Sequence, residues 1–200
     1  RYVEQGADEL VLLDVSATPE GRGHALETVR AVREVLPIPL TVGGGVRARA
    51  DAERLLAAGA DKVAVNSAAV AAPELLTDLA ARFGSQCVVL AIDAARRRAD
   101  GPPAWQVVVR GGRDRLDLDA VAWAAEGVRR GAGEILLTSW DRDGTRAGYD
   151  TELLGAVARA VTVPVIASGG ADNAADLDRG LAAGARAVLV ASILHDGLTT

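Results

Sequence analysis

Aspartates follow apolar segments at three places in the sequence. Asp93 comes directly after the run VVLAI, Asp14 follows an apolar run in LLDVSA, and Asp141 and Asp143 lie in SWDRDGT. A carboxylate that leaves a buried strand has apolar walls beside it, which can raise its pKa and suit it to general acid or base catalysis. Asp93 is therefore a candidate general acid or base. The alternatives are that Asp93 caps the following loop and that DRDGT is only a turn.

Two glycine-rich turns have the composition of phosphate-binding loops. TVGGGV contains Gly44-Gly45, and IASGGA contains Gly169-Gly170. Glycine lets backbone N–H groups approach an anion closely, and the N-terminus of a following helix adds a favourable dipole. One strand further along the chain, Asn66-Ser67 and Ala191-Ser192 each supply a serine hydroxyl. We predict a phosphate at each turn, although either turn alone equally fits tight strand-to-helix geometry.

Both turns belong to an internal repeat with an offset of 125 residues, the spacing between Gly44 and Gly169. At this offset GADELVLL from Gly6 aligns with GAGEILLT from Gly131, and the segment LAAGA occurs in both copies. We expect the two copies to share one pattern of strand, helix and turn. The matching phosphate sites then predict a ligand with a phosphate at each end.

Short apolar runs alternate with longer amphipathic segments along the chain. The runs contain Val, Ile and Leu without polar alternation, which is typical of buried parallel strands. The predicted strands are Glu9–Asp14, Ile38–Val42, Lys62–Asn66, Gln86–Ile92, Glu134–Ser139, Val163–Ala167 and Ala187–Ala191. The predicted helices are His24–Val35, Ala48–Ala57, Pro73–Arg82, Leu118–Arg130, Thr151–Ala160 and Asn173–Ala182. A hairpin-like insertion at Arg96–Arg115 adds one further strand, WQVVV.

This alternation predicts an α/β fold with a parallel sheet. We expect a (β/α)8 TIM barrel with a two-fold half-barrel repeat, as one domain over residues 1–200 with halves 1–93 and 94–200. Residue 1 falls in the tail of a helix pattern, and the sequence has no methionine. The chain is therefore expected to lack the first strand, most of the first helix and the last helix. A doubly wound open sheet is the alternative, but it does not account for the repeat.

Composition narrows the function classes. The net charge of −5 argues against a general nucleic-acid binder. No apolar run reaches the roughly 18 residues that would indicate a membrane span. Cys87 is the single cysteine, so no disulfide framework is expected and a reducing, cytoplasmic location fits. No metal-ligand spacing is present among the histidines and the cysteine, and we predict neither a metal nor a cofactor.

Four charged residues occupy the amino-terminal ends of predicted strands. They are Glu9, Asp61, Lys62 and Glu134, of which Glu9 and Glu134 are repeat equivalents. The simpler interpretation is a solvated ring of charges at the bottom of the barrel. The sharper hypothesis is a charged constriction on the barrel axis, with Asp61 available to a partner protein.

Several segments together resemble the cyclase subunits of imidazole glycerol phosphate synthase. They are LTVGGGV, GADKVAVNSAAV, FGSQCVVLAIDA, GAGEILLTSWDRDGTRAGYD and the IASGGA turn. The resemblance covers essentially the whole chain and implies a (β/α)8 lyase of histidine biosynthesis. Such an enzyme converts a bis-phosphorylated ribulosyl-formimino-aminoimidazole carboxamide intermediate and ammonia into imidazole glycerol phosphate and an aminoimidazole carboxamide ribotide. The ammonia comes through the barrel from a glutaminase partner docked on the bottom face.

The resemblance also implies roles for individual residues. Asp93 matches the second catalytic aspartate, and the first would lie on a strand before residue 1. Asp61 matches a contact with the glutaminase. The residues that match the ammonia gate are Glu9, Lys62 and Glu134. The phosphate-binding and substrate-binding residues, predicted from the turns and the resemblance together, are Asp14, Gly44, Gly45, Asn66, Ser67, Thr138, Asp143, Gly144, Ser168, Gly169, Gly170, Ala191 and Ser192.

The sequence departs from the family pattern at three places. Ser67 stands where threonine is usual, which keeps the hydroxyl. Ala171-Asp172-Asn173 replaces a more glycine-rich turn and places an acid near one phosphate site, and Arg113–Asp117 lacks the usual Thr-Gly. Two other functions stay open: the related phosphoribosylformimino isomerase, which shares the GGG and RDGT elements, and a non-catalytic barrel fragment that binds only phosphates or a partner.

Overall fold

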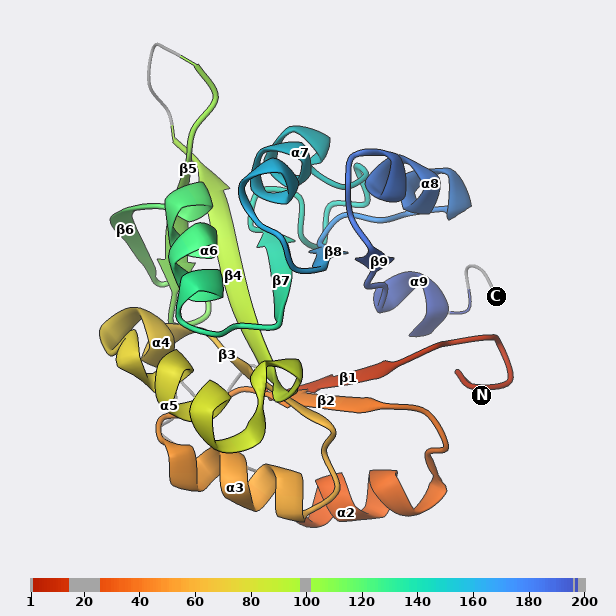
Figure 1. Cartoon of the computed structure of the whole chain (residues 1–200). Helices are drawn as coiled ribbons and strands as arrows, with labels where there is room; N and C mark the ends of the chain where they lie inside the picture. Colours follow the sequence, from red (N-terminus) through yellow and green to blue (C-terminus); the bar gives the residue numbers. More distant parts are fainter. Residues whose placement is uncertain (1, 15–25, 98–101, 196, 198–200) are drawn as a thin grey trace. The chain divides into compact units, whose positions relative to one another are not determined.

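The computed structural model describes residues 2–14, 26–97, 102–195 and 197. These residues form two compact units (Figure 1). Unit 1 comprises Arg1–Leu90 together with Arg130–Gly133, and unit 2 comprises Ala91–Arg129 together with Glu134–Thr200. Each unit is described separately below.

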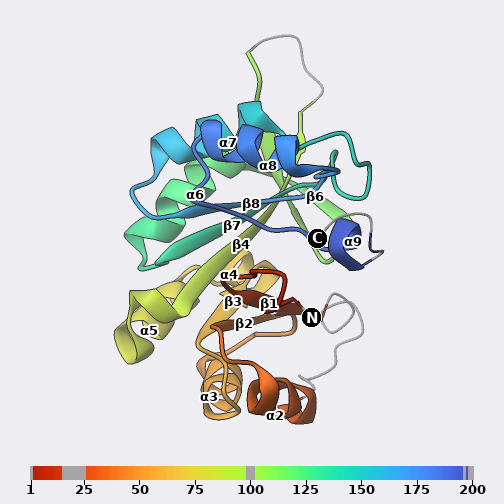
Figure 2. The ribbon, with the colours of Figure 1, turned by 90° about the vertical axis from the view of Figure 1, so that its right-hand side faces the viewer.

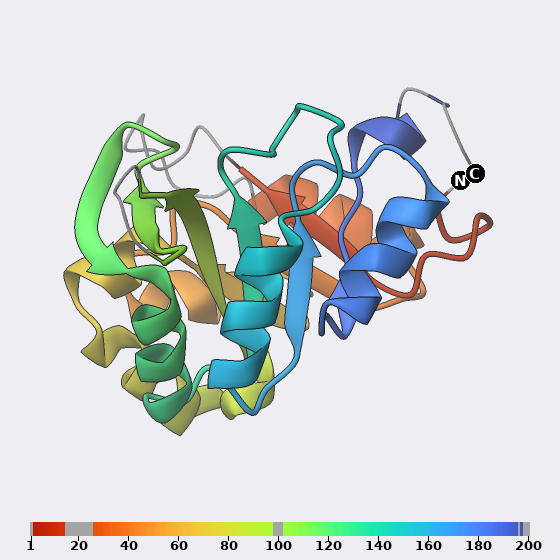
Figure 3. The same ribbon diagram turned by 90° about the horizontal axis from the view of Figure 1, so that it is seen from above.

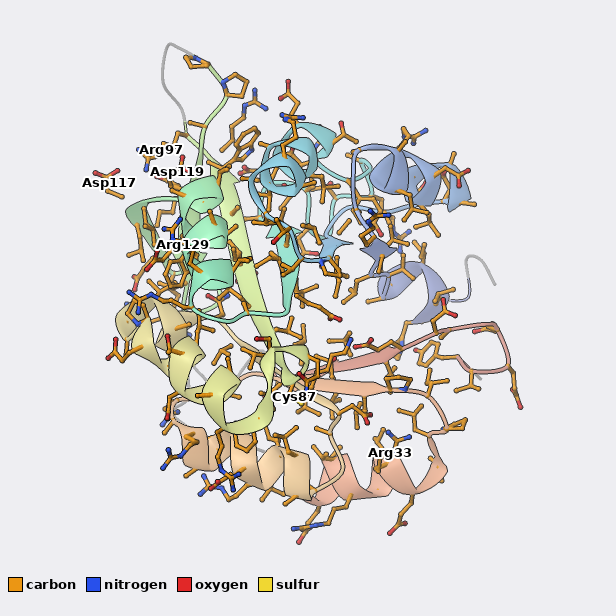
Figure 4. The ribbon with its side chains drawn as sticks, in the orientation of Figure 1. Arg33, Cys87, Arg97, Asp117, Asp119 and Arg129 are labelled. Atoms are coloured by element: carbon orange, nitrogen blue, oxygen red, sulfur yellow. The ribbon has the colours of Figure 1, made fainter. Side chains whose placement is uncertain are left out.

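Unit 1 contains a parallel sheet whose strands follow one another in chain order. Its strands are β1 (Leu10–Leu13), β2 (Leu40–Gly43), β3 (Lys62–Val65) and the first residues of β4 (Val88–Arg96). Its helices are α2 (Leu26–Val35), α3 (Arg49–Ala57), α4 (Ser67–Ala71), α5 (Glu74–Phe83) and the 3-10 helix η1 (Ser85–Cys87). Helices α2 and α3 lie on one side of the strands (Figure 2). Cys87 ends η1 and is half-buried (Figure 4).

Unit 2 continues β4 and again places its parallel strands in chain order. Its parallel strands are β4, β7 (Glu134–Ser139), β8 (Val165–Ser168) and β9 (Ala187–Val188), and its helices are α6 (Ala120–Arg129), α7 (Thr151–Ala160), α8 (Ala174–Ala182) and α9 (Ser192–His195). Strands β7 and β8 run side by side in the same direction (Figure 3). Two antiparallel strands, β5 (Trp105–Val109) and β6 (Asp114–Asp119), extend from the end of β4.

The strand order confirms the barrel type of fold. In a (β/α)8 barrel each parallel strand lies beside the next one in the chain, whereas a doubly wound sheet reverses its order at a switch point. The order is β1-β2-β3-β4 in unit 1 and β4-β7-β8-β9 in unit 2, with the β5–β6 hairpin as an insertion. The doubly wound alternative is therefore wrong.

The core of each unit lies between its strands and helices. Leu40, Leu55 and Leu76 are fully buried in unit 1, and Ile135 and Val157 are fully buried in unit 2. Burying a side chain of this size contributes about 1.5–3 kcal/mol. The amphipathic helices therefore hold the strands in place mainly through these apolar contacts.

The internal repeat is present at the level of strand register. The pairs Leu10↔Leu40 to Leu13↔Gly43 in unit 1 match Ile135↔Val165 to Thr138↔Ser168 in unit 2, each at the offset of 125 residues. The next strand pairs match in the same way, from Thr41↔Lys62 to Ile166↔Ala187. A shift of one residue would turn every side chain to the other face of a strand, so the shared register places equivalent residues in equivalent settings.

Several predicted boundaries are wrong. Strand β4 begins at Val88 and runs through Asp93 to Arg96, because β5 pairs with its second part. The predicted strand Gln86–Ile92 therefore starts two residues early and ends four residues early. The predicted loop at Arg113–Asp117 falls mostly in β6, and β9 ends at Val188 rather than Ala191. Helix α2 is described from Leu26, so its predicted start at His24 lies outside the described residues.

Candidate functional site

Both glycine turns have backbone conformations that require glycine. Gly44 and Gly169 have φ angles of +92° and +88°. A Cβ atom on Gly44 would lie 2.1 Å from the carbonyl oxygen of Asp14, and one on Gly169 would lie 2.9 Å from that of Ser139. Asp14 and Ser139 are themselves repeat equivalents. In both units the turn therefore lies so close to a neighbouring backbone carbonyl that only glycine fits. This agrees with the interpretation of the turns as tight strand-to-helix connections. Because glycine has no side chain, the N–H groups of the turns are also not covered by one.

In unit 2 the turn packs against the loop between β7 and α7. The Cβ of Asp143 lies 3.3 Å from the position a Cβ on Gly169 would take. The backbone N–H of Gly148 donates a 2.7 Å hydrogen bond to the carbonyl of Gly170. Asp143 and the Gly169-Gly170 turn are thus brought together, as expected for one phosphate site. Gly144 lies in the same loop with a φ of +71° and is exposed.

The two serine-containing segments also fold alike. The carbonyl of Asn66 accepts a 2.9 Å hydrogen bond from the N–H of Ala69, and that of Ala191 accepts a 3.2 Å bond from Leu194. Ser67 and Ser192 are therefore the first residues of two short helices, α4 and α9. Ser67 is half-buried and Ser192 is exposed.

Asp93 and the pocket-lining residues lie on strands of unit 2. Asp93 is half-buried and stands opposite Val108 of β5, inside β4 rather than after its end. The expectation that Asp93 leaves the strand at its last residue is therefore wrong. Thr138 and Ser168 are half-buried and face each other in register on β7 and β8.

Two of the predicted gate residues form an ion pair in unit 1. The Lys62 Nζ atom lies 2.8 Å from Glu9 Oε2, and the side chains are 18% and 26% exposed. The hydroxyl of Thr41 donates to the other carboxylate oxygen of Glu9. This ion pair is partly buried. Glu134, the third predicted member, is the first residue of β7 in unit 2.

Asp61 has partners within unit 1. Its Oδ2 atom accepts hydrogen bonds from Arg33 Nη1 at 3.0 Å and from the N–H of Leu40 at 2.8 Å. Arg33, on α2 (Figure 4), also donates to the carbonyls of Leu36 and Ile38. Asp61 therefore joins α2 to the starts of β2 and β3, a structural role that the sequence analysis missed. About half of its side chain stays exposed, at 51%.

A buried carboxylate fixes the helix that follows the second glycine turn. Asp176 is 3% exposed and accepts hydrogen bonds from the N–H groups of Asp172 and Asn173 at 2.9 and 3.2 Å. Asn173 caps α8 in return, and Arg179 pairs with Asp176. Burial tends to raise the pKa of Asp176, but these backbone hydrogen bonds and Arg179 lower it on balance. The spacing Asn-x-x-Asp at the start of α8 is the sequence signal for this arrangement.

Tyr149 lies beside this cluster. Its hydroxyl donates a 2.8 Å hydrogen bond to the carbonyl of Leu189. Burial, with a smaller contribution from the negative charge of Asp176, raises the pKa of Tyr149. The loop after β7 and the segment after β9 are therefore joined by a neutral phenol that stays protonated well above neutral pH.

The β5–β6 hairpin contacts the loop that carries Asp143. A Cβ atom on Gly112, in the hairpin turn, would lie 1.9 Å from the indole ring of Trp140. The N–H of Arg96 donates a 2.6 Å hydrogen bond to Asp141, and Arg115 lies 4.0 Å from the same carboxylate. An ion pair of 3.0 Å between Arg97, which follows β4, and Asp117 of β6 joins the hairpin to the end of β4 (Figure 4). The insertion thus supports the loop, which its sequence alone did not indicate.

Two properties of the described residues bear on the class of protein. Within residues 2–14, 26–97, 102–195 and 197, no group of His, Cys, Asp and Glu side chains is arranged to hold a metal ion. Among the described helices, none combines the length and the apolar character that a membrane crossing needs.

Comparisons with known proteins agree with this arrangement. The family model described as "Histidine biosynthesis protein" matches residues 1–200. Imidazole glycerol phosphate synthase subunit HisF from Corynebacterium urealyticum is 58% identical over 197 residues, which cover 98% of this chain and 78% of that protein. The subunit of the same name from Myxococcus xanthus is 60% identical over 201 residues, which cover 100% of this chain and 78% of that protein. The chain therefore belongs to the histidine biosynthesis protein family, and its relatives there include HisF subunits of imidazole glycerol phosphate synthase.

Proposed function

We propose that the chain is the cyclase of an imidazole glycerol phosphate synthase. It combines ammonia with a bis-phosphorylated ribulosyl-formimino-aminoimidazole carboxamide intermediate and releases imidazole glycerol phosphate and an aminoimidazole carboxamide ribotide. The observation that carries this proposal is the pair of glycine turns with identical strand register, in a chain about 60% identical to HisF subunits. A repeated phosphate cradle fits a substrate with two phosphates. We assign the two halves to residues 1–93 and 94–200.

In this proposal each half binds one phosphate. The first phosphate accepts hydrogen bonds from the backbone of Gly44-Gly45 and from Ser67, and the second from Gly169-Gly170 and Ser192. Backbone N–H groups at a glycine turn bind an anion through hydrogen bonds, without a flexible charged side chain beside it. Asp143 lies against the second turn. We assign to it the orientation of the loop between β7 and α7 and of a substrate hydroxyl group, and not direct binding of the phosphate.

Asp93 is the proposed general acid or base. Its side chain is half-buried within β4, which limits the water around the carboxylate. Cyclisation to an imidazole requires proton transfers at nitrogen and at a carbonyl oxygen, and a positioned carboxylate contributes typically about 10²–10⁴-fold to such a step. Thr138 and Ser168, which pair in register on β7 and β8, offer hydroxyl groups to the substrate.

The ammonia arrives from a glutaminase partner in the cytoplasm. Glu9 and Lys62 form a closed, partly buried ion pair at the amino-terminal ends of β1 and β3. Opening of such a pair would admit a small polar molecule, and we assign Glu134 to the same gate. The names of the relatives describe subunits of a synthase, which supports a partner chain.

The test is ammonium-dependent consumption of the ribulosyl substrate. Because the match covers 78% of each relative, the assay is run on this chain and on the chain completed with the unmatched segments of the Myxococcus xanthus relative. We expect turnover that the Asp93→Asn variant loses by at least about 10²-fold, with substrate binding retained. Asp78→Asn, at an exposed ion pair with Arg49 on the helices of unit 1, is the matched control and should keep full activity.

Three outcomes would contradict the proposal. Full turnover by the Asp93→Asn variant would remove the role of Asp93. Ammonia-independent isomerisation of the aldose precursor would identify the related isomerase instead. Binding of the bis-phosphorylated substrate without any turnover by the completed chain would leave a phosphate-binding protein.

A further inference from the structure

A surface groove of about 610 Å³ lies in unit 2, between the carboxyl-terminal ends of α7 and α8 and the start of β8. Its apolar walls include Val163, Pro164 and Leu181, and Leu181 is 45% exposed. Two arginines, Arg159 and Arg186, also line it. The groove is on the side of the amino-terminal ends of β8 and β9, whereas the Gly169-Gly170 turn of the same unit follows the carboxyl-terminal end of β8.

The equivalent place in unit 1 is filled by a side chain. There Arg33 lies over Gly59, whose Cβ would come within 2.5 Å of the arginine Cγ. The guanidinium binds Asp61 and the carbonyls of Leu36 and Ile38. Each of these residues has a repeat equivalent that lines the groove in unit 2. The first half therefore carries its own occupant for this site.

The second half lacks that occupant. Ala158 stands at the position of Arg33, and the Cβ of Ala158 lies 2.9 Å from the position that a Cβ on Gly184 would take. Replacement of an arginine side chain by a methyl group leaves the space between the helix ends open. The walls of this space, Val161 and Val163, match the residues whose carbonyls bind Arg33 in unit 1.

The charge of the site is also reversed. Arg186 stands at the position of Asp61, and Arg159 stands at the position of Glu34. Neither arginine forms an ion pair with a described carboxylate, in a chain whose net charge is −5. Two exposed guanidinium groups that share one groove, and that form no ion pair among the described residues, complement a carboxylate, which Arg binds with two parallel hydrogen bonds.

We propose that this groove binds an acidic side chain of a partner protein. Its carboxylate pairs with Arg186 and Arg159, and its methylene groups pack against Leu181 and Val163. In unit 1, Arg33 fills this site and pairs with Asp61 of the same chain. In unit 2 the site is lined by two arginines, and the carboxylate that pairs with them comes from the partner protein. This inference rests on the proposed function, because the partner it names is the second subunit of the synthase.

The test measures the affinity of the cognate glutaminase subunit for single variants of this chain by titration calorimetry. Charge reversal in Arg186→Glu should weaken binding by at least about tenfold and reduce the dependence of affinity on salt. Arg49→Glu makes the same charge change at the first residue of α3, where Arg49 already pairs with Asp78, and should alter affinity by less than about twofold. Thermal unfolding of each variant shows that it is folded.

A second variant tests the groove without removing a charge. Ala158→Arg supplies the side chain that fills the site in unit 1 and should also weaken partner binding, by occlusion. Unchanged affinity in both Arg186→Glu and Ala158→Arg would overturn the inference. Binding of free glutarate to the isolated chain, with partner affinity unaffected by either variant, would identify a small-molecule carboxylate site instead. Ammonium-dependent turnover by the unmodified protein tests the proposed function separately, because it does not require the partner.

Discussion

Replacement of Asp176 by alanine probes the segment that follows the second glycine turn. The Asp176→Ala variant leaves the N–H groups of Asp172 and Asn173 without their carboxylate acceptor and removes the pairing with Arg179. These contacts exist only in the folded chain. The repeat provides a matched control in Asp51, which accepts from two backbone N–H groups and pairs with an arginine three residues later in the same way.

The expected loss of stability follows from burial. Hydrogen bonds to a charged group contribute about 1.5–3 kcal/mol each, and exposed ion pairs contribute about 1 kcal/mol or less. Asp176 is 3% exposed, so water cannot replace the carboxylate, and we expect Asp176→Ala to lower the free energy of unfolding by about 3–4 kcal/mol. The Asp51 side chain is 17% exposed, so Asp51→Ala should cost about 2 kcal/mol or less.

Urea denaturation near neutral pH measures both variants, and thermal unfolding should show a decrease in Tm of about 6–12 °C for Asp176→Ala. The pKa of Asp176 is lowered in the folded state, so its contribution is present above the unfolded pKa and is lost as the pH falls through the folded value. The two proteins should therefore converge in stability below about pH 4. Equal losses in the two variants, or a constant difference down to the lowest pH, would refute this reasoning.

The remaining predictions concern other contacts described above. Tyr149→Phe should cost about 1 kcal/mol near neutral pH through the lost hydrogen bond to Leu189. Because burial raises the pKa of Tyr149, the stability it provides is complete below the unfolded pKa and declines above about pH 10, so alkaline denaturation curves should converge for the two proteins. Gly44→Ala should cost at least about 3 kcal/mol because of its backbone overlap and positive φ, whereas Gly144→Ala, with open space around its Cβ, should cost about 1–2 kcal/mol; chemical denaturation distinguishes them. Trp140→Ala should accelerate tryptic cleavage of the β5–β6 hairpin by about tenfold, and an unchanged rate would show that the indole does not hold the hairpin.

The sequence predicted the fold where the local signals were repeated. Apolar runs without alternation predicted β7 with the observed bounds, and the amphipathic pattern predicted α7 with the observed bounds as well. The glycine turns were recognisable because Gly44 and Gly169 occur in matching surroundings. These features depend on residues close together in the chain, which a single sequence contains in full.

Long-range contacts account for most of what was missed. The continuation of β4 past Asp93 depends on pairing with β5, and WQVVV gave no indication of which strand it would join. The role of Asp61 depends on Arg33, which is 28 residues away and on another element. Comparison of the two copies of the repeat contains a signal for this contact. Arg33 and Asp61 are replaced together in the second copy, by Ala158 and Arg186.

The contact between Gly112 and Trp140 also constrains which substitutions each position accepts. Any side chain at position 112 would occupy the space of the indole, so a larger residue there requires a smaller one at position 140. A residue with a side chain at position 112 would therefore need both a smaller residue at position 140 and relief of the positive φ of +85°. A change at position 112 alone would produce a clash with the indole ring, and loss of the ring alone would leave a void over the hairpin turn.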